Sequence, residues 1–378
     1  MIKSSGVSEE GVGFFLQRRI IILGVITILV IGLIVIVPIL IQSVFKEDTS
    51  LTTTIGDPSK IQVMVSVSVG DVKALRGSDI FGVEVGDVLR GGDTIITGPN
   101  SECVIQVGNG VALKILENTS LSIAGVIQNQ DKQENIFSLV KGSIVSLVKK
   151  LNNENIRIRT STGLALVRGT KFMVSSDNDK TTLIVSDGKV ASSIRSKAVG
   201  DIFTGLSPEQ REKLVLLEGI SEVDVESGKQ IDVSKADQNK VDEKVKSSLS
   251  SQDLSNIDNL VSELSKTVSE VSKGVKLTTK DADKSKLELI NKSVSEDMIV
   301  DLANSVEVSF ILDPTAEDLA VFVNDVALSK GDSKRFLEKN KTYTITIKSR
   351  DTILYREEIR FNKKTKIIIK RKGINKIE

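Results

Sequence analysis

The chain has 378 residues and a formal net charge of +1, from 51 basic and 50 acidic side chains. It contains no His and one Cys, which excludes Ser-His-Asp and Cys-His catalysis, His-ligated metal sites and an intramolecular disulfide. The balanced charge gives no indication of nucleic-acid binding, and the lack of Trp argues against a surface on which bases or sugars stack. We therefore expect no catalytic residue, no metal, no cofactor and no nucleic-acid partner.

An uncharged apolar run extends from Ile20 to Ile41, and Thr27 is its only polar side chain. A helix of about 22 residues, at ~1.5 Å per residue, covers the ~30 Å hydrocarbon core of a bilayer. A cleaved signal peptide is the alternative, but its apolar region is shorter, about 7–15 residues, and ends at a small-residue cleavage site that is missing here. Basic residues up to Arg19 precede the run, so the positive-inside rule predicts a cytoplasmic tail (1–19) and a transmembrane helix (20–42).

Beyond the span, the apolar residues alternate with polar ones, as in half-buried strands. Residues 43–60 are rich in Thr, Ser, Asp, Pro and Gly and are expected to form a linker. From 61 to 196 a period of two recurs, for example in Ile61–Val67 and Ile156–Thr160, and turn pairs such as Asp187-Gly188 separate the runs. This pattern predicts an all-β roll, barrel or sandwich.

Several short motifs follow one another in this region. They are Val85–Leu89, Gly92–Gly98, Asn100-Ser101, Leu113 with Leu121–Ile123, Leu139–Ile144, Thr160, Ala165–Phe172 and the Leu183–Val190 hairpin. In this order they resemble the signature of the FecR domain, an extracytoplasmic β module of bacterial envelope proteins, over about a third of the chain. The resemblance implies a bacterial inner-membrane protein with its bulk in the periplasm.

Most of the motif residues have a structural interpretation. The positions concerned are Gly86, Asp87, Gly92, Asp93, Thr94, Gly142, Gly169 and Phe172. The glycines are expected at turns or bulges where a Cβ would cause strain, and the two carboxylates are expected to accept hydrogen bonds from the amides that follow them. Phe172 is expected in the core.

Arg168 has two interpretations. It could contact an anion or a partner together with Arg157, Arg159 and Thr170, and these four residues are the candidate binding site. It could instead form a structural ion pair with a carboxylate such as Asp87, or hydrogen bonds to main-chain carbonyls.

Residues 197–304 have a helical pattern. Ser207-Pro208-Glu209-Gln210 has the residues of a capped helix start, with Ser at the N-cap and Gln at the third helical position. A heptad stripe follows at 254–271 and ends at Gly274. The stripe could mediate self-association, but we expect it to pack within the chain, against a helix at about 284–302. The many Ser and Lys residues suggest a solvated spacer.

From 305 to 373 strands return, and five or six of them in about seventy residues fit a small β-sandwich. Val321–Asp325 and Lys341–Ile347 resemble the PEGA-type domain, which implies an interaction or spacer module. Basic residues from Lys363 to Lys372 could protect a sheet edge, or could contact anionic lipid or a wall polymer. A short tail, 374–378, ends the chain.

The sequence thus predicts a mainly β protein with some α structure: one transmembrane helix, a FecR-like β domain, an amphipathic helical region and a C-terminal β-sandwich. We expect a non-enzymatic, membrane-anchored protein whose FecR-like domain binds an extracytoplasmic protein or a wall polymer. The alternative is a FecR-type transducer that regulates an extracytoplasmic-function sigma factor. In that family a cytoplasmic domain binds the sigma factor, and the tail of residues 1–19 is too short to form such a domain. A hydrolase would require a deep pocket with convergent carboxylates.

Overall fold

The computed structural model describes most of the chain after the predicted span. The described residues are 49–55, 61–108, 110–129, 132–149, 154–249, 257–299, 304–314, 319–324, 326–328, 333–350, 352–371 and 373–377. The predicted span from Ile20 to Ile41 and the tail before it lie outside these ranges. In the part of the chain that is described, no helix is both long enough and apolar enough to cross a membrane.

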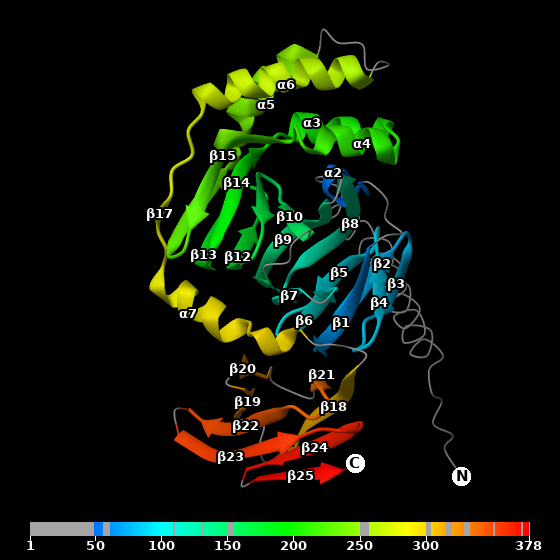
Figure 1. Cartoon of the computed structure of the whole chain (residues 1–378), viewed down its shortest axis with the longest axis vertical. Helices are drawn as coiled ribbons and strands as arrows, with labels where there is room; N and C mark the ends of the chain where they lie inside the picture. Colours follow the sequence, from blue (N-terminus) through cyan, green and yellow to red (C-terminus); the bar gives the residue numbers. More distant parts are fainter. Residues whose placement is uncertain are drawn as a thin grey trace, which may run out of the picture. The chain divides into compact units, whose positions relative to one another are not determined.

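Two packed sheets form the domain that follows the linker (Figure 1). The first sheet has the order β3-β2-β5-β8-β9-β10-β11-β14-β15, and the second has the order β4-β1-β6-β7-β9-β12-β13-β16-β17. The strands are β1 (Gln62–Val69), β2 (Val72–Arg76), β3 (Asp79–Gly82), β4 (Val88–Arg90), β5 (Thr94–Thr97), β6 (Glu102–Val107), β7 (Val111–Ile115), β8 (Ser120–Asn129), β9 (Lys132–Val148), β10 (Glu154–Arg159), β11 (Gly163–Val167), β12 (Lys171–Ser176), β13 (Lys180–Asp187), β14 (Lys189–Arg195), β15 (Gly219–Glu226), β16 (Lys229–Ser234) and β17 (Lys280–Asp281). The predicted all-β domain is confirmed.

Strand β9 belongs to both sheets. Its first part pairs with β8 and β10, and its last part pairs with β7 and β12. The change occurs at Gly142, whose φ is +96° and whose Cβ, if present, would lie 2.6 Å from the Cα of Thr119. Only glycine fits this position, because any side chain would meet both backbone strain and a clash.

The sheets extend past the predicted domain boundary. The hairpin β15–β16 adds one strand to each sheet, since β15 pairs with β14 and β16 pairs with β13. The structure therefore corrects the division at residue 196 and the all-helical interpretation of 197–304. Ile220, Val225, Ile231 and Val233 are all buried, and such β-branched residues favour strands.

Helices cover the outer face of the first sheet. They are α3 (Lys197–Ile202), α4 (Pro208–Val215), α5 (Lys235–Leu249) and α6 (Ile257–Gly274), with the 3-10 turn η2 (Phe203–Gly205) between α3 and α4. The predicted capping box is confirmed: Ser207 and Gln210 exchange hydrogen bonds at the start of α4. The predicted end of α6 at Gly274 is also confirmed.

The heptad stripe of α6 packs inside the chain. Its residues Leu264 and Val271 are buried against α5 and β15, and Ile257, Val261 and Val268 are partly buried there; Leu254 lies outside the described residues. The neighbour of α6 is α5, so the predicted partner at 284–302 is wrong. That segment contains α7 (Lys284–Ser293) and η3 (Glu296–Met298), which cover the outer face of the second sheet with Ile290 and Met298. Self-association through 254–271 stays a prediction.

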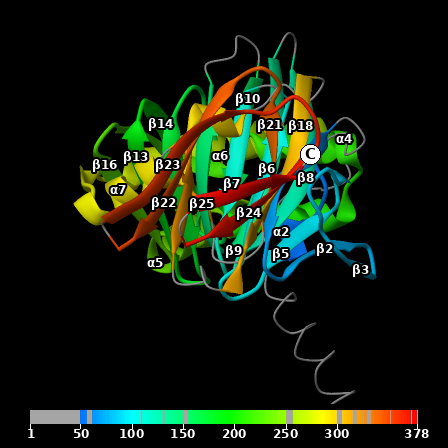
Figure 2. The same ribbon diagram turned by 90° about the horizontal axis from the view of Figure 1, so that it is seen from below.

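The C-terminal module is a small β-sandwich, as predicted. One sheet has the order β21-β18-β24-β25 and the other has the order β20-β19-β22-β23. The strands are β18 (Ser305–Leu312), β19 (Ala320–Val323), β20 (Val326–Ala327), β21 (Ser333–Glu338), β22 (Thr342–Ser349), β23 (Thr352–Arg360), β24 (Thr365–Lys370) and β25 (Gly373–Ile377). Phe310, Tyr343 and Phe361 fill the core between the sheets. Strand β21 also pairs with β1, through Val67 and Arg335, so the module continues the second sheet of the larger domain (Figures 1 and 2).

Candidate functional site

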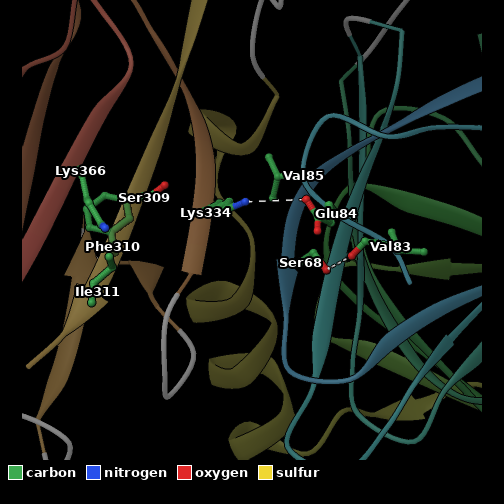
Figure 3. A pocket seen from close by; sticks show the side chains of 9 residues that line it. All are labelled: Ser68, Val83, Glu84, Val85, Ser309, Phe310, Ile311, Lys334 and Lys366. Atoms are coloured by element: carbon green, nitrogen blue, oxygen red, sulfur yellow. Dashed lines mark hydrogen bonds and ion pairs between the residues drawn. The ribbon is translucent and has the colours of Figure 1, made fainter. Parts of the chain in front are cut away.

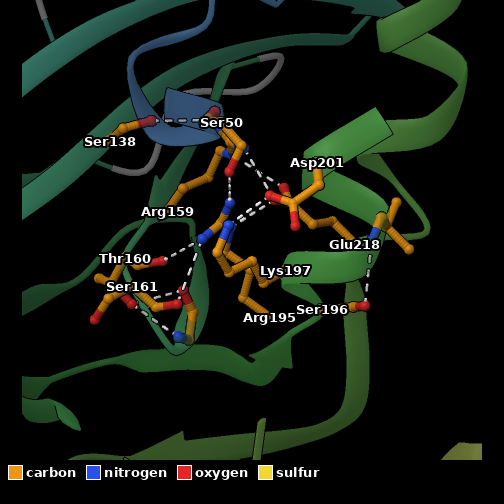
Figure 4. A network of polar contacts seen from close by, with 12 residues as sticks. Ser50, Ser138, Arg159, Thr160, Ser161, Arg195, Ser196, Lys197, Asp201 and Glu218 are labelled. Atoms are coloured by element: carbon orange, nitrogen blue, oxygen red, sulfur yellow. Dashed lines mark hydrogen bonds and ion pairs between the residues drawn. The ribbon is translucent and has the colours of Figure 1, made fainter. Parts of the chain in front are cut away.

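Three charged side chains meet beneath the helices that cover the first sheet (Figure 4). Arg159 ends β10, Arg195 ends β14, and Glu218 directly precedes β15; all three are 0% exposed. Glu218 accepts hydrogen bonds from Arg159 Nε and Nη2, both at 2.9 Å, and from Arg195 Nε at 2.5 Å. We call these three residues the arginine cluster.

The remaining donors of the arginine cluster bind main-chain and hydroxyl oxygens. Arg159 donates to Ser138 Oγ at 3.2 Å and to the carbonyl of Ser50 at 3.1 Å. Arg195 donates to the carbonyl of Thr160 at 3.3 Å and to Ser50 Oγ. Buried guanidinium groups require this degree of pairing, because an unpaired charge would lose its hydration without compensation.

The electrostatics of the cluster depend on Glu218. Burial alone would raise its pKa, but the two guanidinium groups of Arg159 and Arg195 hold the pKa below its ordinary value. The nearby Asp242 behaves differently: burial raises its pKa, although it accepts hydrogen bonds from the amide of Ala198 and from Ser196 Oγ. The pKa values of the two carboxylates are therefore shifted in opposite directions.

Ser50 belongs to a short segment, Ser50 to Ile55, that we call the strap. It contains most of helix α2 (Thr49–Thr52). Leu51 and Ile55 are buried at 1% and 0% exposure, and the Ile55 amide donates to the carbonyl of Ala124 at 3.2 Å. Arg211, on α4, donates to the carbonyl of Thr54 at 2.9 Å. The strap is thus fixed between the first sheet and its helices, whereas the sequence predicted a linker throughout 43–60.

Gly125 shows how closely the strap approaches the sheet. Its φ is +148°, and a Cβ built there would lie 2.2 Å from the carbonyl oxygen of Ile55. Any side chain at this position would displace the strap. The spacing of Leu51 and Ile55, one helical turn apart, was the one sequence signal that these residues are not a plain linker.

The predicted binding residues do not form one surface. Arg157 is 8% exposed and pairs with Glu134, and Arg159 is in the arginine cluster. Thr170 is 2% exposed, whereas Arg168 is exposed at the end of β11. Among the described residues Arg168 has no ion pair, and Asp87 accepts a hydrogen bond from the Glu84 amide instead. Only Arg168 is therefore available to a partner in this conformation.

The motif residues with a structural interpretation lie mainly where the sequence predicted. Gly86, Gly92, Gly142 and Gly169 have positive φ angles of 98°, 94°, 96° and 64°, and Thr94 and Phe172 are buried. The direction of the carboxylate hydrogen bonds is corrected, because Asp87 and Asp93 accept from the amides of Glu84 and Arg90, three residues before them. Asp93 also accepts two hydrogen bonds from Arg76, at 2.7 and 2.6 Å. Gly169 lies in the connection that passes from the first sheet to the second.

A shallow cleft of about 370 Å³ lies beside the junction of β1 and β21 (Figure 3). It is lined by Ser68, Val83, Glu84, Val85, Ser309, Phe310, Ile311, Lys334 and Lys366. Glu84 is the carboxylate of this lining and lies 3.9 Å from Lys334. The cleft has no pair of convergent carboxylates, and the described residues contain no cluster of His, Cys, Asp and Glu that could hold a metal ion.

The comparison with family models agrees with the motifs. The family model described as FecR protein matches residues 93–191. Two crystal structures of a "putative anti-sigma factor" from Parabacteroides distasonis are similar to this chain, with TM-scores of 0.31 and 0.30 and identities of 13% and 12%; each match covers 58% of this chain and 78% of the other. No curated protein matches the chain. The PEGA-type resemblance of the C-terminal module stays a prediction. The FecR resemblance is confirmed, and residues 93–191, in the centre of the two-sheet domain, form a FecR domain.

Proposed function

We propose that this chain is a membrane-anchored, non-catalytic regulatory protein. In this proposal the run from Ile20 to Ile41 crosses the inner membrane, and the FecR domain binds an extracytoplasmic protein or a wall polymer. The observation that carries the proposal is the FecR match at residues 93–191. The apolar length of Ile20–Ile41 and the absence of His support the anchor and the lack of catalysis.

The partner contacts the exposed corner around Arg168, where the chain leaves β11 for β12. Strand β11 lies between β10 and β14, and these two strands carry Arg159 and Arg195 at their ends. Leu164, on β11, is the register partner of Arg159 on one side and of Ser193 on the other. A displacement of β11 on binding therefore reaches the arginine cluster and, through Ser50, the strap that leads to the predicted span. Buried ion pairs have few alternative arrangements. A small shift of the arginine cluster therefore displaces the whole strap.

Photocrosslinking in cells tests the partner contact. A photoreactive amino acid replaces Arg168 in the full chain, and the matched control carries it at Asp179, an exposed position in the turn between β12 and β13. We expect an adduct of discrete mass from position 168 and none from position 179. Adducts from neither position, with a partner captured from the exposed faces of α5 or α6 instead, would show that the corner is not the binding surface.

The sigma-factor alternative has its own test. The family resemblance favours it, because FecR-type transducers regulate sigma factors through their cytoplasmic part. We expect a peptide of residues 1–19 to bind none of the extracytoplasmic-function sigma factors of the source organism in a pairwise pull-down. Specific binding of one of them would favour the transducer function over the binding function proposed here.

A further inference from the structure

Two hairpin turns of the C-terminal sandwich lie together at one end of the module (Figure 1). One connects β22 to β23, and the other connects β24 to β25. A Cβ built on Gly373, at the start of β25, would lie 3.6 Å from the Tyr355 ring on β23, so the start of β25 lies beside β23. We call Arg350, Ile353, Leu354, Lys370 and Arg371, which flank these turns, the sandwich tip.

Two large apolar side chains project from the sandwich tip. Ile353 is 50% exposed and Leu354 is 39% exposed, and neither belongs to the core between the two sheets. The register explains their exposure: Ile347 pairs with Tyr355 and Lys348 pairs with Ile353, so Leu354 is the extra residue of a β-bulge. Bulges redirect side chains, and this one turns an apolar residue outward instead of into the core.

Exposed basic residues accompany the two apolar side chains at this end of the module. Arg350, Lys370 and Arg371 are all exposed. In the segments 350–354 and 370–373 the sequence contains one acidic residue, Asp351, against four basic ones. Protection of a sheet edge by Lys would account for the charges alone, but it gives no reason to expose Ile353 and Leu354 beside them. An exposed apolar pair accompanied by several basic residues is the pattern of an interfacial membrane contact.

We propose that the sandwich tip docks on an anionic lipid bilayer, with Ile353 and Leu354 entering the headgroup region and the basic side chains binding lipid phosphates. The charge of the tip complements an anionic bilayer, and each basic residue near such a surface strengthens the contact about fivefold. At the boundary between the headgroups and the acyl chains, the exposed apolar pair loses contact with water that it keeps in the protein alone. This inference is independent of the partner of the FecR domain.

Fluorescence quenching tests the contact in the full chain. Cysteine replaces Ile353 and carries an environment-sensitive fluorophore; Cys103 stays unlabelled because it is fully buried and its pKa is raised by that burial. The protein is reconstituted with phosphatidylglycerol vesicles that contain nitroxide-labelled lipid. We expect strong quenching at position 353, and an about fivefold weaker contact in each of the variants Arg350→Ser, Lys370→Ser and Arg371→Ser.

The matched control places the fluorophore at Leu289, a 43% exposed apolar residue on α7. We expect little quenching there, and little quenching at position 353 in phosphatidylcholine vesicles. Equal quenching at 353 and 289 would overturn the proposal, and so would quenching that is the same in both lipids. Shielding of the 353 fluorophore without quenching by lipid would mean that the tip contacts protein, which also overturns it.

Discussion

Glu218 accepts hydrogen bonds from two fully buried guanidinium groups, and its own side chain is 0% exposed. Breaking a buried ion pair by removing one partner leaves the other charge without hydration or compensation, which typically destabilises a protein by about 3–5 kcal/mol. The arginine cluster also joins strands β10 and β14 to the strap. An intact arginine cluster therefore contributes both to the stability of the two-sheet domain and to the attachment of the strap.

We expect Glu218→Gln to lower the free energy of unfolding by about 3 kcal/mol, because both guanidinium groups lose their counter-ion while the hydrogen-bonding shape is kept. Denaturant titration followed by circular dichroism measures the change. The matched control is Glu222→Gln, since Glu222 is exposed on β15; we expect a change within about 0.5 kcal/mol there. Equal effects of the two substitutions would show that the cluster contributes no special stability.

The pH dependence of stability follows from the lowered pKa of Glu218. Its stabilising contribution is complete above the unfolded pKa of about 4.3 and is lost as the pH falls through the lower folded value. Asp242 has a raised pKa because of burial, so its protonation favours the folded state as the pH falls. We expect the stability difference between the native protein and Glu218→Gln to be constant from pH 7 to about pH 5 and to shrink below about pH 4. A difference that persists to pH 3 would contradict this assignment.

The sequence predicted single residues correctly where the local backbone conformation determines their role. The predictions were incomplete where the role of a side chain depends on whether it is buried. Gly86, Gly92, Gly142 and Gly169 all have positive φ, as turn motifs require. Arg157 and Arg159 were predicted to belong to a binding site with Arg168, yet both are buried and form ion pairs with Glu134 and Glu218. Alternation shows that two side chains share a face, and it does not show whether that face is covered.

At the scale of elements, the strap is the segment whose structure the sequence did not predict. It lies on β8, where the Ile55 amide bonds to Ala124, and Gly125 provides the space for its carbonyl. Its attachment comes from contacts with residues far along the chain, among them Arg159 and Arg211. The linker-like composition of this segment reflects only the conformational preferences of its own residues, so it carries no information about contacts with distant residues.

We expect Gly125→Ala to detach the strap, because the new Cβ would overlap the carbonyl oxygen of Ile55. Hydrogen exchange of the Ile55 amide measures the effect, and we expect its protection to fall at least tenfold, to about the level of a frayed segment. Gly82→Ala is the control, since nothing lies within 4 Å of a Cβ there. Unchanged protection in Gly125→Ala would mean that the strap does not depend on this close approach.

The hairpin β15–β16 shows a second limit at this scale. Its buried β-branched residues lie between α4 and α5, and the helical signals on both sides led to a helical prediction for the whole region. The hairpin completes both sheets, because β14 and β13 would otherwise present open edges. Pairing of an edge with a distant strand is a tertiary requirement that the local pattern does not express.

At the scale of the whole molecule, the C-terminal sandwich is joined to the two-sheet domain by strand pairing and not by a linker alone. Val67 and Ser68 of β1 pair with Arg335 and Lys334 of β21. Arg335 is 7% exposed at this junction, and burial lowers its pKa to about 10, an effect that the carboxylate of Glu102 opposes. The strand pairing and the buried Arg335 therefore couple the two modules at this junction.

We expect deletion of residues 1–48 to release the protein into the soluble fraction, because the deletion removes Ile20–Ile41 and leaves the strap and all described strands. Carbonate extraction of membranes, followed by immunodetection, compares the full chain with the deleted one. The control deletes 2–17, which keeps the apolar run and should keep the protein in the membrane pellet. A full chain that carbonate releases would contradict the predicted span.

The sequence by itself determined the β class of the FecR domain, its motif order, the helix start at Ser207 and the sandwich at the C-terminus. Periodicity and turn chemistry act over a few residues, and these features depend on nothing longer. Only the tertiary structure decided that Ser50, Arg159, Arg195 and Glu218 meet in one buried cluster. Such a meeting depends on which faces become covered when the helices and the strap fold back on the sheet, and burial of that kind is a property of the whole chain.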